Sequence, residues 1–322
     1  MLRKITIGLS FISVCIAQAH QPPYSFKQQL SMNEAEQLLL KNNAQLKLKQ
    51  SEVAVAQANV AQSKVFDNPQ MGITHNVNNP VTHHYFDLGR EGETDIQLSQ
   101  HIYIGGQRMN GVRKSIAELS GTEADLDNER RIVLHDLREK MIDINTLYEK
   151  SALDNKEIIS LQKILSVYES QAHKGNIPVA EVTRMKTLLF QATKDREGNE
   201  TDMFNAQKEL QILLGLGNVE IVPVINENEM LNQVALLQDT TSVFKNIYKR
   251  GDIRQSESDI EVAQHEIKLQ KSNALPEISL TGEWDKNGNI GHNYFDVGVS
   301  LSIPIFNRNK GNIRAAQETQ NQ

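Results

Sequence analysis

The feature that most restricts the fold is a helical region of about 65 residues that contains apolar side chains spaced three and four residues apart. It begins near Gln107, includes Leu137, Met141 and Ile144, and ends near Ala172. A repeat of 3.5 residues keeps one side of a helix against a neighbouring helix. At 1.5 Å per residue this helix would be about 100 Å long, which no compact globular domain needs.

A turn and a second helix follow. Gly175-Asn176-Ile177-Pro178 places glycine after one helix and proline at the start of the next. The same spacing then continues from Val182 to Leu213, and Gly215 ends it. The sequence therefore predicts a long antiparallel helical hairpin over residues ~107–214. On this pattern alone, a solvent-exposed coiled-coil spacer is an open alternative.

Four other segments alternate between apolar and small polar residues, at ~69–78, ~95–104, ~276–285 and ~294–305. Their length and period are typical of strands in a membrane barrel, with lipid on one face and water on the other. A half-buried sheet in a soluble protein has the same period and is the alternative. We expect the lipid-facing positions to be Ile96, Leu98, Ile102, Leu280, Val297, Val299 and Leu301. The lumen-facing positions are then Gln97, Ser99, His101, Ser279, Thr281, Ser300 and Ser302.

The passage from helix to strand occurs twice. Val55-Ala56-Gln57 recurs 207 residues later as Val262-Ala263-Gln264, and Pro69 matches Pro276. A repeated order of elements indicates a duplicated structural unit. We predict a first repeat at 20–225, with a helix, two strands and the long hairpin. The second repeat, at 226–322, has a helix at ~252–273, two strands and only the start of a long helix.

Two further expectations concern the ends of these repeats. Ser31 and Glu34 form a capping box, which predicts one helix from Ser31 to about Lys64. The second repeat lacks its hairpin, so we expect that 322 residues is a truncated length.

Residues 1–19 have the features of a secretory signal peptide: two basic residues, an apolar run, and Ala17-Gln18-Ala19 as a cleavage site. The single cysteine, Cys15, lies within it, so we expect no disulfide or zinc–thiolate site. The rest of the sequence contains no apolar stretch long enough for a membrane-spanning helix. The net charge of −6 and the absence of a basic run exclude nucleic acid as an expected partner.

The chain resembles the outer-membrane efflux protein family, the TolC-like ducts of Gram-negative bacteria. The residues that carry the resemblance are the segment Lys174–Val182 at the hairpin turn, Arg250-Gly251-Asp252-Ile253-Arg254, and the segment Ile303–Gly311 after the last strand. The last segment is most similar to the heavy-metal CzcC- and CusC-like branch.

The resemblance implies an α+β membrane protein: a homotrimer with a 12-stranded β-barrel in the outer membrane and an α-barrel of long hairpins in the periplasm. It implies a passive duct in a tripartite efflux system, with metal ions as one candidate substrate. The implied partners are a periplasmic adaptor (membrane fusion protein), an inner-membrane pump of the resistance-nodulation-division type and outer-membrane lipid. The adaptor would contact the hairpin tip at Lys174, Gly175, Asn176, Ile177 and Pro178.

Other functions are less well supported by the residues. His83-His84 lies in the first strand loop with His75 nearby, and His292 lies in the other strand loop. These histidines are expected to be solvated, since a defined metal site needs three or four converging ligands. We therefore predict no metal site, cofactor site or catalytic residue. The carboxylates are scattered along helix surfaces, which is not the grouping of an enzyme site. The alternative from another class is a secreted periplasmic coiled-coil adaptor or scaffold without a membrane barrel.

Overall fold

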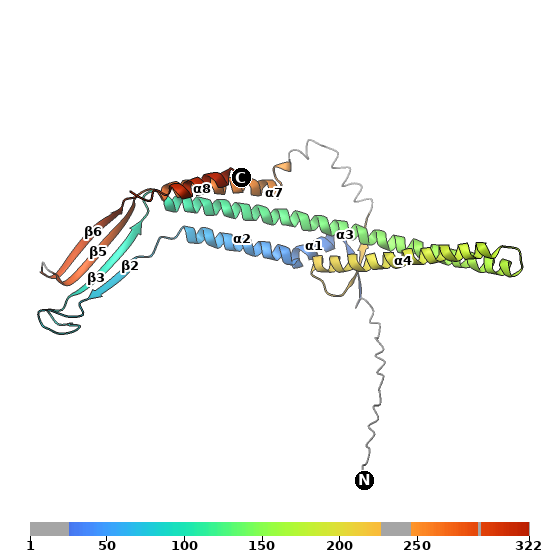
Figure 1. Cartoon of the computed structure of the whole chain (residues 1–322), viewed down its shortest axis with the longest axis horizontal. Coiled ribbons are helices and arrows are strands. Elements are labelled where there is room, and N and C mark those ends of the chain that lie inside the picture. Colours follow the sequence, from blue (N-terminus) through green and yellow to red (C-terminus); the bar gives the residue numbers. More distant parts are fainter. Residues whose placement is uncertain (1–25, 227–245, 289–290, 322) are drawn as a thin grey trace, which may run out of the picture. The chain divides into compact units, whose positions relative to one another are not determined.

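The computed structural model describes residues 26–226, 246–288 and 291–321. The predicted signal peptide at 1–19 lies outside the described residues. The described chain forms two compact units (Figure 1). The hairpin unit contains residues 26–39 together with 137–225, and the sheet unit contains 40–136 together with the described residues from 226 onward. Strands from both predicted repeats pair in one sheet, which belongs to the sheet unit.

Long helices dominate the hairpin unit. Helix α3 (Gln107–His173) is continuous over 67 residues, and its part from Leu137 onward lies in this unit. Helix α4 (Val179–Leu214) returns alongside it (Figure 1). The side chains of Leu137, Met141 and Ile144 are fully buried, as the three–four spacing predicts. The chain is therefore helical from Gln107 to Leu214 except at the turn 174–178.

The hairpin unit also contains a parallel pair of short strands that the sequence analysis did not anticipate. Strand β1 (Lys27–Ser31) pairs with β4 (Glu220–Val224) in parallel register. The buried side chains of Leu30 and Ile221 belong to this pair. Helix α1 (Met32–Asn42) follows β1 directly. The predicted capping box is present, because the Glu34 carboxylate accepts from the Ser31 amide at 2.9 Å.

The prediction of one helix from Ser31 to about Lys64 is wrong. Asn43 interrupts it: α1 ends at Asn42, and α2 (Ala44–Ser63) begins a new helix. Asn43 has φ −56° and ψ 127°, and its side chain accepts from the amide of Leu46 at 3.0 Å. An asparagine N-cap supplies the hydrogen bond that the first turn of a helix lacks. This local hydrogen bond favours the start of a new helix at Ala44 over the continuation of α1.

The sheet unit combines α2, the first part of α3, α7 (Gly251–Ser272) and α8 (Lys310–Gln320) with a four-stranded antiparallel sheet. The strands are β2 (Gln70–His75), β3 (Thr94–Ile102), β5 (Glu277–Gly288) and β6 (Gly291–Ser302), in the order β2-β3-β5-β6. Each overlaps one of the four predicted strand segments. None of the described helices has both the length and the apolar character needed to cross a membrane.

Ion pairs join the helices of the sheet unit. On α3, Asp125 pairs with Lys49 of α2 at 2.8 Å, and Lys114 pairs with Glu266 of α7 at 2.9 Å. At the start of α7 the backbones approach closely: a Cβ added to Gly251 would lie 2.5 Å from the carbonyl oxygen of Ala124. These contacts fix α7 along α3 and so position strand β5, which follows α7.

Candidate functional surfaces: the sheet faces and the hairpin tip

One face of the sheet is apolar. In an antiparallel pair, residues directly opposite each other point to the same face. Leu98 lies opposite Gly282, Gly282 opposite Val297, and Leu280 opposite Val299. The same register joins the whole set that we predicted to face lipid on this one face: Ile96, Leu98, Ile102, Leu280, Val297, Val299 and Leu301. Leu98 is 52% exposed and Val299 69% exposed, so this face has no covering layer within the described chain.

The opposite face is polar. His101 lies opposite Ser279, Ser279 opposite Ser300, and Ser99 opposite Thr281. All residues predicted to face the lumen share this face: Gln97, Ser99, His101, Ser279, Thr281, Ser300 and Ser302. We call this surface the polar face.

The polar face is also acidic, which the sequence analysis did not predict. Asp95 lies directly opposite Asp285, and Glu283 directly opposite Asp296. Like charges in this relation destabilise a sheet. The strands contribute no Lys or Arg to this face. These facing carboxylates could not be predicted from the sequence, because the pairing of β3 with β5 brings together residues that are 190 positions apart.

The sheet has two free edges within the described residues. Strand β2 pairs only with β3, and β6 pairs only with β5. Each outer edge presents unpaired backbone amides and carbonyls, which in a folded protein are normally paired or protected. The sheet of a single chain is therefore open on both sides.

A polar recess lies beside the polar face, where β2 begins and β3 ends. It has a volume of about 640 Å³, and Asp67, Gln70, Ser99, His101, Tyr103 and Ser279 are among the residues that line it. The Nδ1 atom of His101 lies 3.3 Å from the Ser279 hydroxyl oxygen, and its Nε2 atom lies 3.7 Å from a Glu277 carboxylate oxygen. The Tyr103 ring packs edge-on against the imidazole, with centroids 4.6 Å apart.

The tip of the hairpin is a closed turn. Gly175 has φ +79°, in the left-handed region that favours glycine. The amide of Asn176 donates to the carbonyl of Gln171 at 3.0 Å, and that of Gly175 donates to Ala172 at 3.0 Å. This pair of bonds is the Schellman motif. Pro178 then caps α4 with φ −64° and ψ 142°. The predicted tip residues 174–178 form this turn, and all except the half-buried Ile177 are exposed.

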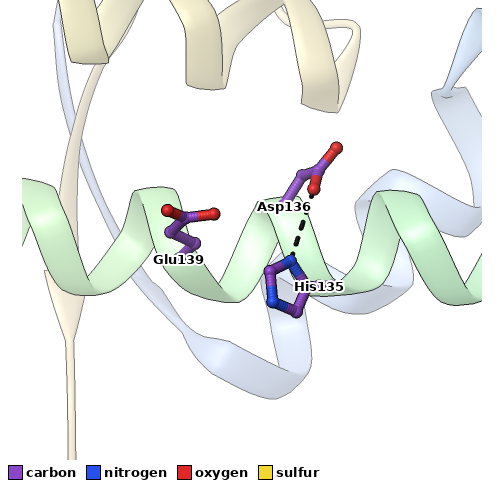
Figure 2. Close-up of side chains that lie close together, drawn as sticks. All are labelled: His135, Asp136 and Glu139. Carbon is purple, nitrogen blue, oxygen red and sulfur yellow. Dashed lines mark hydrogen bonds and ion pairs between the residues drawn. The ribbon is translucent and has the colours of Figure 1, made fainter.

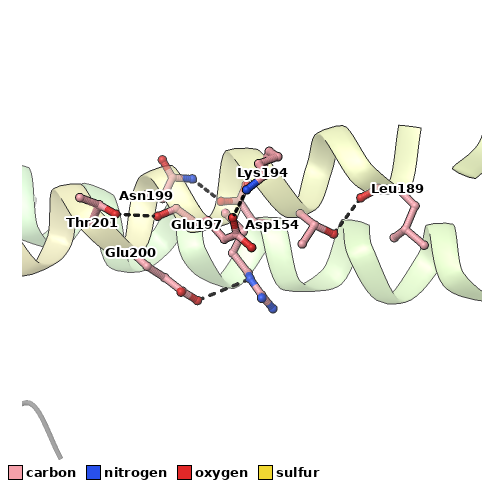
Figure 3. A network of polar contacts seen from close by, with 9 residues as sticks. Asp154, Leu189, Lys194, Glu197, Asn199, Glu200 and Thr201 are labelled. Atoms are coloured by element: carbon pink, nitrogen blue, oxygen red, sulfur yellow. Dashed lines mark hydrogen bonds and ion pairs between the residues drawn. The ribbon is translucent and has the colours of Figure 1, made fainter. Parts of the chain in front are cut away.

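A buried polar contact lies between the two helices of the hairpin (Figure 3). The Asn199 side chain of α4 donates to the carboxylate of Asp154 on α3. Asn199 is 4% exposed. Nearby polar groups, such as Lys194 with Glu197 at 2.6 Å, pair along α4 itself. A single polar residue in a helix seam fixes the register of the two helices, because any slip would leave it unpaired.

His292, which was predicted to lie in a strand loop, lies within strand β6, and His75 is the last residue of β2. His75 contacts the Thr94 hydroxyl at 2.9 Å through Nδ1, and His83 has a left-handed backbone with φ 56°. A different group lies on α3, where His135, Asp136 and Glu139 place ligand atoms within 4.8 Å of one another (Figure 2). All three are exposed, and sequential exposed side chains on one helix are common without a metal. None of these three residues was predicted from the sequence to be a ligand.

Comparisons with known proteins agree with this arrangement. The sequence profile of the family described as "Outer membrane efflux protein" matches residues 36–216 and 247–322. The outer membrane efflux protein BepC of Brucella suis is 22% identical in an alignment of 295 residues that covers 86% of this chain and 61% of BepC. The nickel-cobalt-cadmium resistance protein NccC of Alcaligenes xylosoxydans is 21% identical over 305 residues, covering 94% of this chain and 65% of NccC. The chain thus spans less than two thirds of either relative.

Solved structures show the same fold. The transmembrane channel protein CusC superposes with a TM-score of 0.72 at 18% identity, over 90% of this chain and 70% of CusC. The outer membrane channel CmeC of Campylobacter jejuni superposes with a TM-score of 0.70 at 18% identity, over 90% of this chain and 65% of CmeC.

Proposed function

This chain belongs to the outer membrane efflux protein family, and on that premise we propose that it is the duct of a tripartite efflux system. The family is located in the outer membrane, extends into the periplasm and consists of ducts, not enzymes. The duct gives substrates an enclosed aqueous path to the exterior. The energy for export comes from a pump in the inner membrane.

The observation that carries the proposal is the division of one four-stranded sheet into an exposed apolar face and a polar face. Lipid requires an apolar outer surface, whereas a water-filled lumen requires a polar inner one. A soluble protein would cover the apolar face, since large exposed apolar patches mark interaction or membrane surfaces. The free edges of β2 and β6 also indicate that the sheet needs further strands to pair with.

We propose that three copies supply those strands. A membrane barrel has at least about eight strands and leaves no edge unpaired. Four strands per chain cannot close, but a homotrimer has 12. In this arrangement β6 of one copy pairs with β2 of the next, and the long hairpins form an α-barrel in the periplasm.

The proposed partners follow from the position of the hairpin tip. The turn 174–178 is the end of the long hairpin, and its backbone bonds are satisfied internally. Its exposed groups are therefore available to another protein. We propose that this turn contacts a periplasmic adaptor, which connects the duct to a pump of the resistance-nodulation-division type.

Metal ions are the proposed substrate class. The polar face carries carboxylates without strand Lys or Arg, and a surface lined by one sign of charge raises the local concentration of counter-ions. NccC, whose name describes nickel, cobalt and cadmium resistance, is one of the relatives.

Thiol labelling tests the proposed faces. The only cysteine is Cys15, in the predicted signal peptide, so single cysteines can be introduced on a cysteine-free background. In outer-membrane vesicles, a charged maleimide should label Ser99→Cys and Ser300→Cys rapidly. The neighbouring variants Leu98→Cys and Val299→Cys should remain unlabelled until detergent is added. Equal labelling of both pairs in intact vesicles would contradict the barrel.

A secreted periplasmic adaptor without a barrel is not favoured, because the matching family and the solved relatives are outer membrane channels. Fractionation distinguishes the two classes. A duct remains with the outer membrane after washing in high salt, whereas an adaptor is recovered in the soluble periplasm or with the inner membrane.

A further inference from the structure

We propose that His101 and Glu277 form a binding site for a divalent transition-metal ion, with Zn²⁺ or Ni²⁺ as the expected ions. The site lies beside the recess on the polar face, within the sheet unit. That it contacts the exported ion rests on the proposed function, whereas binding of the metal itself can be tested independently.

The imidazole of His101 is already held as a metal ligand requires. Its Nδ1 atom is engaged by the Ser279 hydroxyl at 3.3 Å, and the ring packs against Tyr103. In metalloproteins, a partner on one ring nitrogen fixes the tautomer and orientation so that the other nitrogen can bind the metal. Here the remaining nitrogen, Nε2, is the atom nearest the Glu277 carboxylate.

The distance between the two ligand atoms fits an intervening ion better than a direct bond. His101 Nε2 and Glu277 Oε2 are 3.7 Å apart, whereas a direct N–H···O bond is about 2.7–3.2 Å long. Zinc binds imidazole nitrogen and carboxylate oxygen at about 2.0–2.2 Å. With a tetrahedral angle at the metal, two such ligands lie about 3.4 Å apart. A shift of a few tenths of an ångström in the Glu277 side chain is enough to bind the ion.

The surroundings favour a cation. Glu277 belongs to β5, whose polar face also carries Glu283 and Asp285, and no strand places Lys or Arg on this face. Asp67 and the Tyr103 hydroxyl line the adjoining recess. Glu277 is partly exposed, as is His101, so water reaches the site and can complete the coordination of the metal.

Two protein ligands make a weak, exchangeable site, which suits a path for ions. Conduction requires that binding be favourable enough for entry and weak enough for release. A structural zinc site has four protein ligands and holds its ion. The His101–Glu277 site therefore differs from a structural zinc site. In the proposed trimer it occurs once per copy around the lumen.

Calorimetric titration of the purified, detergent-solubilised protein with Zn²⁺ tests the site. We expect His101→Gln to abolish one binding event per chain and Glu277→Gln to weaken it by at least tenfold. Ser279→Ala removes the partner of Nδ1 and should weaken binding by about tenfold. His75→Gln is the matched control, because His75 also bonds a hydroxyl through Nδ1 but belongs to no ion pair among the described residues. His135→Gln controls for the exposed cluster on α3.

Each result decides between specific possibilities. Zinc binding that is unchanged in both His101→Gln and Glu277→Gln overturns the site, whatever the thiol labelling shows. Loss of the event in His101→Gln, with equal thiol labelling at Leu98 and Ser99, keeps the site and rejects the duct. The circular dichroism spectrum of the metal-free variants must match that of the unmodified protein, and the isosteric Glu277→Gln variant tests the site if His101→Gln does not fold.

Discussion

Gln207 pairs with both backbone polar groups of Ile221. The amide nitrogen of Ile221 donates to the Gln207 side-chain oxygen at 2.9 Å, and the Gln207 side-chain nitrogen donates to the Ile221 carbonyl at 2.6 Å. The Gln207 side chain is fully buried. It therefore takes the place of a neighbouring strand for β4 and binds that strand to α4.

Replacing Gln207 by leucine should destabilise the hairpin unit by about 2–4 kcal/mol, because two buried backbone groups lose their partners and each costs about 1–3 kcal/mol. Denaturant unfolding in detergent, followed by circular dichroism, measures the change. The control is Gln191→Leu on the same helix. Gln191 is exposed, and among the described residues its side chain bonds only to Asp195, at 3.1 Å, so its replacement should change stability by less than about 0.5 kcal/mol. Equal effects of the two variants would contradict the role of Gln207.

Two glycines of the sheet unit should respond oppositely to alanine. At Gly251 a Cβ would lie within 2.6 Å of backbone atoms of Ala124 and Asn128, so Gly251→Ala should separate α7 from α3 and lower the melting temperature. At Gly111, within α3, a Cβ would meet nothing within 4 Å, and Gly111→Ala should stabilise the helix by up to about 1 kcal/mol. Thermal unfolding of both variants measures the contrast. A stabilised Gly251→Ala variant would show that the two helices are not in this contact.

Arginine distinguishes the two faces of the sheet in a membrane. Leu98→Arg and Val299→Arg should reduce insertion into the outer membrane, because arginine on the lipid face costs about 2–4 kcal/mol near the midplane. Ser99→Arg and Ser300→Arg, one residue along each strand, should insert normally. The measurement is the fraction of heat-modifiable protein recovered in the outer membrane. A soluble sheet predicts no such difference between neighbouring positions.

The ion pair between Lys114 and Glu266 predicts a loss of stability in acid. Burial raises the pKa of Glu266, but the hydrogen bonds from Lys114 and Gln270 outweigh it and hold the pKa below 4.5. Because the folded pKa is the lower one, this carboxylate contributes its full stability above pH 4.5 and loses it as the pH falls through the folded value.

Lys114→Met should therefore reduce the difference in stability between pH 7 and pH 3.5 by about 1 kcal/mol or less, as expected for a partly exposed pair. Urea midpoints at both pH values measure it. Lys163→Met, on the same helix but in the hairpin unit, is the control. An unchanged pH dependence in Lys114→Met would contradict the coupling to Glu266.

The long helices could be predicted from sequence because their signal is repeated many times. Leu137, Met141 and Ile144 follow the three–four spacing, and all are buried. The pair β1–β4 could not, since Lys27–Ser31 is mostly polar and the second strand contains Pro223. This strand pair is held together by backbone pairing between segments that are far apart in the sequence and by the side chain of Gln207. The break at Asn43 does have a signal in the sequence, the pair Asn42-Asn43, since asparagine is a poor helix former and a favoured N-cap.

The candidate surfaces were likewise predictable from the sequence only in part. Alternation along each strand predicted which residues share a face, and the register places Leu98 and Ser99 on opposite faces. The pairing of β3 with β5 was not predictable from one sequence. For that reason the facing carboxylates of Asp95 and Asp285, and the approach of Glu277 to His101, emerged only from the folded sheet.

The order β2-β3-β5-β6 has a consequence for assembly. The strands occur in the sheet as they occur along the chain, and each runs opposite to its neighbour. Since the strand number is even, β2 and β6 point in opposite directions. In the proposed ring of copies, the last strand of one copy would meet the first strand of the next with antiparallel polarity, and no copy would have to be inverted. Such an antiparallel junction is possible in a ring with any number of copies. The curvature of the sheet and the packing of the helices would therefore determine how many copies form the ring.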